Sequence, residues 1–520
     1  MMARLNGFIL LFLLVFTPAS SLAQDDRLIP AGDYAYEYIV RLQRRGHLLE
    51  LNPTAIPYRR GDVWAALDHV DNSRLEPAEA HWVKLLRHSL KPATPHEDKA
   101  GVGYTFLVAA QTINSDRIDP LRPQGDAINF YWYGTWATAY LDAGPIVGEM
   151  GLYHNRFYEN DPDGFDVALR LWARSEHTYA GYHSRWASAY LGRWDVHWGV
   201  PGETATVMSD NARSRDQLML RLGGNRLSVT GLLGELDSAT GGRYFTGRAA
   251  DDSVRLGSTR RFMAAHRWDF RPSKRFMLSF MESAIYSGVS ASPSLKYLNP
   301  LHPFTFVVDN IPKNDENNGM LAGLMWAQWN RLTLHGQFLV DDIRLQANTG
   351  PETITFVMAG TAALALRSAD LEFSFDAVTS RAYNAPQPEG RYIYLNRGLA
   401  TQFSDYVQAS LAAEFYLDRW VPGLRVAPRI DRLWQGERDM RQPFPGNDER
   451  PRNLLDGTVE RTTRSAVYAA WQPLHWWWLS MDAGVNFSQR GSAAHKTRFV
   501  GLISAGVRLT LDGSLDLWSN

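Results

Sequence analysis

The chain has 520 residues, a formal net charge of −1 and no cysteine. The balanced charge argues against a nucleic-acid partner, and the lack of cysteine excludes disulfide scaffolds, thiolate metal sites and cysteine nucleophiles. Aromatic residues make up 12% of the chain although 21% of it is charged, a mixture that favours elements with one apolar and one polar face.

Residues 1–23 have the organisation of a secretory signal peptide. Arg4 forms a short basic region, residues 8–16 (FILLFLLVF) are an unbroken apolar run, and small residues at Ser21 and Ala23 fit the signal-peptidase site. The apolar run is too short to span a membrane, and no later run reaches the length of about 18 residues that a transmembrane helix needs. We therefore expect an exported chain that is either soluble or an outer-membrane β-barrel.

Residues 24–100 are predicted to form a small helical domain. Apolar residues recur at helical spacing over residues 34–49, and two further amphipathic segments follow at 58–70 and 76–90. Asp62 is expected to cap the second helix. The prediction is thus a bundle of about three helices.

From Gly101 onward the apolar period changes from 3.6 to 2. In residues 371–377, the apolar Leu371, Phe373 and Phe375 alternate with polar residues, and the same alternation occurs at 332–341, 476–488 and 499–511. Side chains of a strand point alternately to its two faces. Residues 101–520 are therefore predicted to be mainly β.

The lengths of the predicted connections distinguish a membrane barrel from a soluble β-sandwich. Short turns are predicted near 142–145, 223–226, 271–274, 367–370, 418–423 and 472–475. Long polar loops are predicted near 114–126, 156–165, 199–216, 237–257, 288–319, 342–352, 381–401, 435–460 and 489–496. Their alternation is typical of a transmembrane antiparallel up-and-down β-barrel. We expect about 18 strands, with both chain ends periplasmic and residues 175–198 forming either one long strand or two.

Tryptophans cluster near the predicted strand ends. They are Trp194, Trp198, Trp326, Trp329, Trp420, Trp471 and Trp476–Trp478. Tryptophan prefers the membrane–water interface, so we expect these rings to face lipid. The alternative is the core of a soluble β-protein.

Arg193, Asp195 and His197 lie two residues apart and could form a catalytic cluster. On a strand, however, they would share one wall, so we expect a lumen-facing ladder of paired charges with Trp194 and Trp198 toward lipid. Ser209 is the only nearby serine, and no surrounding pattern would activate it. No phosphate loop, dinucleotide fingerprint or HExxH segment is present. We expect no enzymatic activity and no cofactor.

Metal sites have weak support in the sequence. Residues 160–166 and 314–319 carry enough oxygen donors for calcium, but neither has the spacing of a calcium loop, and the same residue types form ordinary turns. We expect no metal. Loops at 114–126, 296–319 and 434–453 are instead rich in the Arg, Asn, Asp and aromatic residues that bind polysaccharide, with a solvated surface as the alternative.

Several segments resemble the capsule assembly Wzi family. WGVPGETATVMSDNA (198–212) is similar to the W-G-P-G…S-x-N-A segment of that family, although Val200 separates Gly199 from Pro201. The segments 59–67, 231–238, 265–288 and 295–304 are also similar.

The resemblance implies an 18-stranded outer-membrane barrel that is preceded by a periplasmic helical bundle. It further implies a lectin that holds capsular or exopolysaccharide at the cell surface; an outer-membrane porin or polysaccharide channel is the alternative. Ligand-binding residues are expected at the barrel mouth and in the lumen: Arg193, Asp195, His197, Trp198, Asn211, Glu282 and His302. Outer-membrane lipid is the other expected partner, and we expect a monomer.

Overall fold

A computed structural model of the chain describes residues 26–91, 101–125, 130–155, 161–164, 174–239, 259–288, 290–303, 316–344, 353–444 and 452–514. The expected signal peptide lies outside these residues. No helix in the described ranges is long and apolar enough to cross a membrane.

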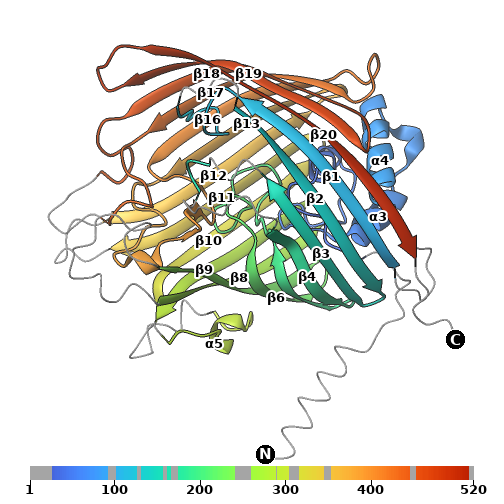
Figure 1. Cartoon of the computed structure of the whole chain (residues 1–520), viewed down its shortest axis with the longest axis horizontal. Coiled ribbons are helices and arrows are strands. Elements are labelled where there is room, and N and C mark those ends of the chain that lie inside the picture. Colours follow the sequence, from blue (N-terminus) through green and yellow to red (C-terminus); the bar gives the residue numbers. More distant parts are fainter. Residues whose placement is uncertain are drawn as a thin grey trace, which may run out of the picture.

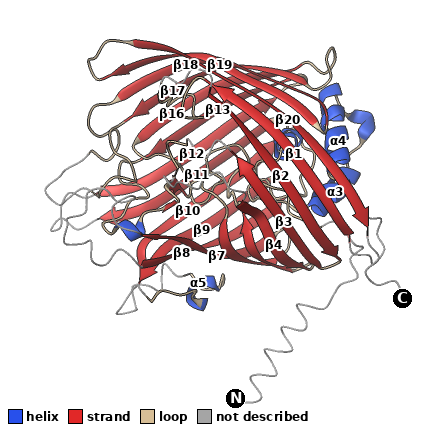
Figure 2. Cartoon of the chain, viewed as in Figure 1, coloured by secondary structure: helices blue, strands red, loops and turns tan. Residues whose placement is uncertain are grey.

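Eighteen strands form one closed antiparallel sheet (Figures 1 and 2). They are β1 (Gly101–Ile113), β2 (Phe130–Ala143), β3 (Ile146–Asn155), β4 (Arg174–His183), β5 (Ala187–Trp194), β6 (Arg215–Gly223), β7 (Leu227–Ala239), β8 (Thr259–Ser273), β9 (Phe276–Gly288), β10 (Glu316–Trp329), β11 (Leu332–Arg344), β12 (Thr353–Ala365), β13 (Ala369–Val378), β16 (Tyr406–Tyr416), β17 (Leu424–Gln435), β18 (Glu460–Leu474), β19 (Trp477–Arg490) and β20 (Lys496–Ser514). Each strand pairs with its neighbours in the chain, and β1 also pairs with β20, which closes the ring. The predicted fold class and strand number are confirmed.

Short and long connections alternate around the barrel as predicted. The six predicted short turns are present, and two more join β4 to β5 and β10 to β11. The sequence 175–198 therefore contains two strands, and β5 ends at Trp194 rather than at Trp198. We call the two ends of the barrel the short-turn end and the long-loop end.

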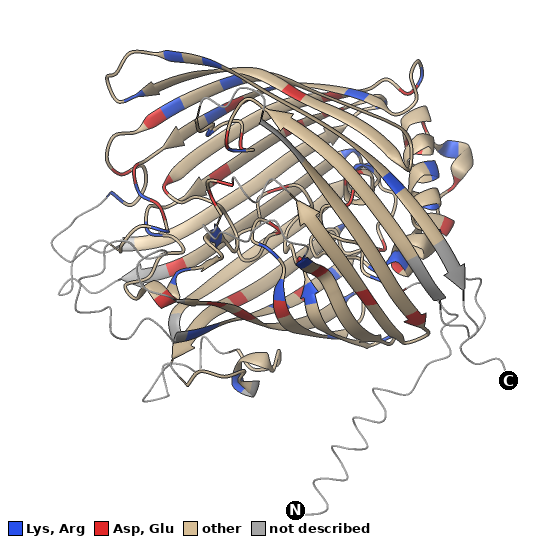
Figure 3. Ribbon diagram, viewed as in Figure 1, with Lys and Arg blue, Asp and Glu red and all other residues tan. Residues whose placement is uncertain are grey.

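The two faces of the wall differ in polarity. On β13, Leu371 and Phe373 are 41% and 47% exposed on the outer face, whereas Glu372 between them pairs inside with Arg44 at 2.6 Å. Large exposed apolar side chains recur on most strands at outward positions. Charged residues of both signs are interspersed along the chain and are not gathered by sign (Figure 3).

The N-terminal segment is helical as expected. It contains α2 (Ala35–Arg44), α3 (Arg60–Asp68), the 3-10 turn η1 (Asn72–Arg74) and α4 (Pro77–Ser89). A reciprocal capping box between Glu76 and Glu79, with Pro77 in the first turn, begins α4. The prediction that Asp62 caps α3 is wrong. The residue at the N-terminal cap of this helix is Arg59, and the Asp62 carboxylate accepts a hydrogen bond from Arg59 Nε at 2.9 Å.

Ion pairs attach α2 to the inner wall of the barrel. Arg41 pairs with Glu414 at 2.9 Å, and Arg45 pairs with Asp370 at 2.6 Å. These acidic residues lie near short turns, and α3 and α4 lie at the same end of the barrel (Figure 1). The helices therefore pack into the short-turn end. The expected domain boundary at residue 100 falls in 92–100, outside the described residues.

Two connections from the long-loop end fold into the lumen. They are residues 195–214, and residues 379–405 with the small hairpin β14 (Ile393–Tyr394) and β15 (Arg397–Gly398). Their apolar side chains join inward-facing residues of the wall in one core. The Tyr392 hydroxyl donates to the carbonyl of Val207 at 2.8 Å, which joins the two connections.

The expected lipid-facing position of Trp194 and Trp198 is wrong, and Val196 between them is buried as well. All three are buried, with 0%, 2% and 2% of their surface exposed, and all belong to the lumen core. Trp326, for which the same position was expected, is likewise 2% exposed and lies in that core, whereas Trp329 and Trp420 are 75% and 74% exposed. Since β5 ends at Trp194, alternation no longer governs Val196 and Trp198, and the apolar loop fills the barrel.

Candidate functional site

Loops of the long-loop end enclose a cavity of about 560 Å³, which we call the mouth pocket. Its lining is polar and comes from four connections far apart in the sequence. The charged and amide residues of that lining are Arg117, Asp119, Arg122, Asp161, Asp163, His197, Glu203, Asp210, Asn211, Arg397 and Gln402. Groups of this kind can form hydrogen bonds with hydroxyls from several directions at once.

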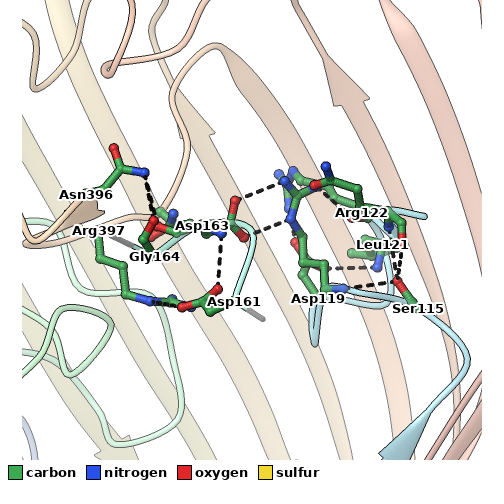
Figure 4. A network of polar contacts seen from close by, with 12 residues as sticks. Ser115, Asp119, Leu121, Arg122, Asp161, Asp163, Gly164, Asn396 and Arg397 are labelled. Carbon is green, nitrogen blue, oxygen red and sulfur yellow. Dashed lines mark hydrogen bonds and ion pairs between the residues drawn. The ribbon is translucent and has the colours of Figure 1, made fainter. Parts of the chain in front are cut away.

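Two arginine–aspartate pairs join the loops around the mouth pocket. Arg117 makes a bidentate contact with Asp163, with Nε and Nη2 at 2.8 and 2.9 Å from the carboxylate oxygens. Arg397 donates from Nε and Nη2 to Oδ2 of Asp161 at 3.0 and 2.6 Å, and Asp161 in turn accepts from the backbone of Asp163 (Figure 4). Bidentate charge-assisted bonds of this kind fix geometry as well as charge.

A third arginine extends the network toward β16 and β17. Arg122 Nη1 donates to Asp119 at 2.9 Å (Figure 4), and its Nε donates to Gln435 at 2.9 Å. The guanidinium groups of Arg117 and Arg122 also lie 5.2 and 4.8 Å from the ring centroid of Phe403. The arginines of the mouth pocket are therefore held on several sides.

Burial raises the pKa of Asp163, but the hydrogen bonds and charge of Arg117 outweigh this effect and lower it below its ordinary value. Asp210 behaves in the same way, because the hydrogen bond and charge of His197 outweigh its burial and lower its pKa. Both side chains are consequently carboxylates at neutral pH.

His197 is buried beside the mouth pocket, and both of its ring nitrogens face acceptors. Nδ1 lies 3.0 Å from Oδ1 of Asp210 and Nε2 lies 3.1 Å from the carbonyl of Val200. The ring is thus fixed between a carboxylate on one side and a backbone carbonyl on the other. The Ser209 hydroxyl instead donates to the carbonyl of Ala400. The arrangement within these described residues is therefore not that of a serine activated by a histidine.

Asp195 lines a second cavity of about 460 Å³, which we call the inner cavity. Residues of the N-terminal segment, among them Arg27 and Asp33, also line it, so it lies toward the short-turn end. Burial raises the pKa of Asp195 well above its ordinary value, and the nearby carboxylates of Glu176 and Asp210 raise it further.

The two cavities share four lining residues: Ile118, Asp210, Asn211 and Arg397. Asn211 is fixed there, because its Nδ2 donates to the carbonyl of Gly398 and to Oε1 of Gln402, both at 2.8 Å. These side chains therefore stand between the inner cavity and the mouth pocket.

The structure brings together three of the residues singled out in the sequence: Asp195, His197 and Asn211. Arg193 lies elsewhere, because its outward-facing side chain forms an exposed ion pair with Asp216 at 2.6 Å on the neighbouring strand β6. The expectation that Arg193 faces the lumen is wrong. Trp198 lies in the lumen core and lines neither cavity.

Glu282 and His302 belong to a different region, on the outer wall. Glu282 shares the outward face of β9 with the exposed Phe280, yet it is fully buried together with His266 of β8. The helix α5 (Leu295–Leu298) covers them from outside the ring of strands (Figure 1). His302 follows α5 and is half-buried, with its backbone N–H bonded to the carbonyl of Asn299 at 3.0 Å.

The described part of the first calcium candidate segment is already engaged with arginines. Asp161 and Asp163 form the ion pairs with Arg397 and Arg117, and no group of three or more His, Asp or Glu side chains in the described ranges could hold a metal ion. Residues 314 and 315 of the other candidate segment lie outside the described residues.

Sequence reasoning missed the arginines that organise the mouth pocket. The loop at 114–126 was identified as rich in sugar-binding residue types, and Arg117, Asp119 and Arg122 lie in it. Arg397 carries no local signal, because its partners are more than 180 residues away in the chain. Only the inward folding of both connections brings these groups together.

No protein-family model matches the sequence, and no curated protein matches it either. Among solved structures, the fold is similar to that of Wzi from Escherichia coli, an outer-membrane protein involved in group 1 capsule assembly and described as a carbohydrate-binding β-barrel. The TM-score is 0.61 at 12% identity, over 93% of this chain and 99% of that chain. This similarity confirms the fold that the resemblance to the Wzi family implies.

Two barrels from Pseudomonas aeruginosa are also similar. OccD3 (OpdP) has a TM-score of 0.45 at 12% identity, over 79% of this chain and 91% of that chain. OccK3 (OpdO) has a TM-score of 0.46 at 9% identity, over 79% of this chain and 96% of that chain.

Proposed function

We propose that the protein is an outer-membrane lectin that binds capsular or exopolysaccharide and holds it at the cell surface without catalysing a reaction. The long-loop end would face the cell exterior, and the helical segment would lie at the periplasmic end. The observation that carries the proposal is the lumen, which two inward-folded connections fill while leaving a polar pocket on the long-loop side.

The chemistry of the mouth pocket supports glycan recognition. Sugar hydroxyls both donate and accept hydrogen bonds, so a site for them needs acceptors and donors side by side. The carboxylates of Asp161 and Asp163 and the amides of Asn211 and Gln402 supply both kinds of group in the lining. The carbohydrate binding described for the E. coli barrel agrees with this reading.

The competing function is that of a porin or polysaccharide channel. The packing of the lumen argues against an open pore. The carboxamide of Gln337 in the wall accepts from the backbone N–H of Thr206 at 3.0 Å, and the Tyr383 hydroxyl donates to the carbonyl of Thr206. High conductance of the purified protein in planar bilayers would favour the channel and contradict the lectin.

A glycan pull-down with the purified protein and the surface polysaccharide of its host tests the proposal directly. We expect retention of the polymer by the wild type and a loss of about tenfold in affinity, or about 1.4 kcal/mol, for Arg397→Ala. Arg397 fixes both Asp161 and Asn211 in the lining.

The matched control is Arg367→Ala. Arg367 is an exposed arginine in a short turn whose Nε donates to Glu76 at 2.9 Å, far from the long-loop end. This variant should bind the polymer like the wild type. In cells, deletion of the gene should release polysaccharide into the medium, and unchanged retention of the polymer would contradict the proposal.

A further inference from the structure

The N-terminal helical segment reaches the connection at 195–214 inside the barrel, and the first contact is made by the backbone. The N–H of Ile56 donates to the carbonyl of His197 at 3.0 Å, and the N–H of His197 donates to the carbonyl of Ile56 at 3.2 Å. Ile56 lies between α2 and α3, and the two residues are 3% and 2% exposed. A reciprocal pair of backbone hydrogen bonds fixes the register of the two chain segments, as it does in an antiparallel sheet.

The helical segment is itself fixed to the wall next to this bridge. Thr54, two residues before Ile56, accepts at its carbonyl from Nη1 of Arg267 at 2.6 Å and at its hydroxyl from Nη2 of Arg267, also at 2.6 Å. Arg267 belongs to β8 and is 1% exposed. Hydrogen bonds from a charged donor are stronger than those between neutral groups. Residues 54–56 therefore form a fixed support for His197.

A side chain of α2 makes a second contact with the same connection. Arg44, the last residue of α2, places Nη2 3.3 Å from Oε1 of Glu203 in the connection and 2.6 Å from Oε2 of Glu372 in β13. One guanidinium thus lies between two carboxylates, and without its positive charge they would repel each other. The other oxygen of Glu203 lies 2.9 Å from Nδ1 of His335 in β11. Glu203 is therefore held by α2 as well as by the wall.

The residues that receive these contacts belong to the mouth pocket. His197 and Glu203 both line it, and the ring of His197 lies 3.0 Å from the carboxylate of Asp210, which lines it too. The wall holds the same connection through Gln337, which accepts from the N–H of Thr206 at 3.0 Å. The connection that shapes the pocket is thus supported both by the wall and by the segment that enters from the short-turn end.

We infer that the helical segment is part of the glycan site, with Arg44 and the backbone of Ile56 as positioning residues that hold residues 195–214 in the shape that binds the polymer. This inference rests on the proposed function, because it concerns the same pocket. Coupling between two sites is reciprocal. Polymer bound at the long-loop end therefore strengthens the docking of the helical segment, and loosening that segment at the short-turn end weakens the hold on the polymer.

The first measurement is the affinity of the full-length protein for the surface polysaccharide of its host. Arg44→Gln removes the charge between the two carboxylates, and we expect the affinity to fall about tenfold. Arg44→Lys keeps the charge and should recover most of that loss. The matched control is Arg41→Gln, because Arg41 lies three residues earlier in α2 and pairs with Glu414 of the wall. Its affinity should stay within about twofold of the wild type.

Hydrogen exchange of backbone amides gives a readout that a merely structural role of the segment would not change. Saturating polymer should slow exchange of the Ile56 amide in the wild type by about tenfold, because the coupling acts in both directions. The control amide is that of Leu90 at the end of α4, which donates to the carbonyl of Leu86 within the helical segment at 2.9 Å. Its exchange should not depend on the polymer.

Unchanged affinity in Arg44→Gln, or equal losses in Arg44→Gln and Arg41→Gln, would overturn the inference and leave the lectin function standing. Binding of the polymer to the wild type without slower exchange at Ile56 would do the same. Failure of the wild type to bind the polymer at all would instead contradict the proposed function.

Discussion

Two regions of the barrel are held in place by a histidine with two acceptors. Inside the lumen, His197 bonds to Asp210 and to a loop carbonyl, at 3.0 and 3.1 Å. On the outer wall, His266 bonds to Glu282 at 2.8 Å and to the carbonyl of Tyr297 in α5 at 2.9 Å. One histidine secures a connection that folds inward, and the other secures a segment that folds back along the outside.

The two pairs differ in their access to water. His266 and Glu282 are both 0% exposed, beneath Tyr297, which stacks on Tyr286 with ring centroids 4.4 Å apart. Asp210 instead faces the mouth pocket. A buried group that water cannot reach depends on its one partner. A group beside a water-accessible pocket can replace that partner with solvent or ligand. The comparison separates a structural clamp from a group that lines the proposed glycan pocket.

Breaking the outer clamp should have the largest effect. Glu282→Gln removes the carboxyl group that pairs with the buried His266, and we expect the free energy of unfolding to fall by about 3–5 kcal/mol because the remaining partner is left uncompensated. Urea unfolding of the barrel in lipid vesicles, followed by tryptophan fluorescence, measures this change.

A double variant tests the cause of that loss. Replacing both partners with apolar residues, His266→Leu with Glu282→Leu, leaves no uncompensated polar partner and should recover most of the stability, since a packed apolar pair often equals a buried polar one. If the double variant is less stable than Glu282→Gln, the clamp depends on hydrogen bonding to Tyr297 and not on charge.

Loosening the inner connection should cost less stability but should change permeability. Gln337→Ala removes the carboxamide that accepts from the N–H and hydroxyl of Thr206, both at 3.0 Å. The lost bonds of this buried backbone group should cost about 1–3 kcal/mol. Conductance in planar bilayers should rise for Gln337→Ala and stay low for Glu282→Gln, because only the first residue secures the filling of the lumen.

Gln489→Ala is the control for Gln337→Ala. Gln489 lies by the exposed turn after β19, where it bonds to the carbonyl of Ala493. Neither stability nor conductance should change in this variant. A rise in conductance with both glutamine variants would mean that the connection at 195–214 does not block the lumen.

The sequence was sufficient to predict the barrel because its signals are local. Alternation along residues 371–377 and turn residues such as Asp142–Pro145 depend on neighbouring positions, so the strands and short turns could be found one at a time. The sequence did not show whether a turn divides residues 175–198, because the polar and aromatic residues of β4 and β5 continue across 184–186.

The site could be predicted only in part, because its geometry is not local. Alternation on β5 was predicted in the wrong phase, because Trp194 faces the lumen while Arg193 faces outward, and after Trp194 the chain leaves the strand and carries Trp198 into the lumen. Nothing near Arg397 in the chain shows that it will reach Asp161. A long polar loop has the same sequence pattern whether it covers the mouth of the barrel, enters the lumen or lies along the outer wall.

Replacing Asp195 should have a smaller effect on stability than the variants above, and it should stabilise the barrel where they destabilise it. Burial raises its pKa above the ordinary value of 3.8, so its charged form destabilises the folded state, and this penalty grows as the pH rises above that value. Asp195→Asn should therefore stabilise the barrel by about 1 kcal/mol at pH 7. The gain should disappear below pH 3.8, where the carboxyl is protonated in both states. Unfolding curves of the wild type and of Asp195→Asn between pH 3 and pH 7 measure this difference. A variant that is less stable than the wild type at pH 7 would contradict the prediction.

Arg193 should have the smallest effect, although its sequence context looks the most catalytic. Its ion pair with Asp216 is exposed, with 39% and 61% of the two side chains accessible, and such pairs contribute less than about 1 kcal/mol. Arg193→Ala should leave polymer binding unchanged and lower stability by about 0.3 kcal/mol, an effect that disappears in high salt. A tenfold loss of polymer affinity would instead extend the glycan site onto the outer face of β5 and β6. The contrast between a ligand-facing lumen and a purely structural outer wall would then fail.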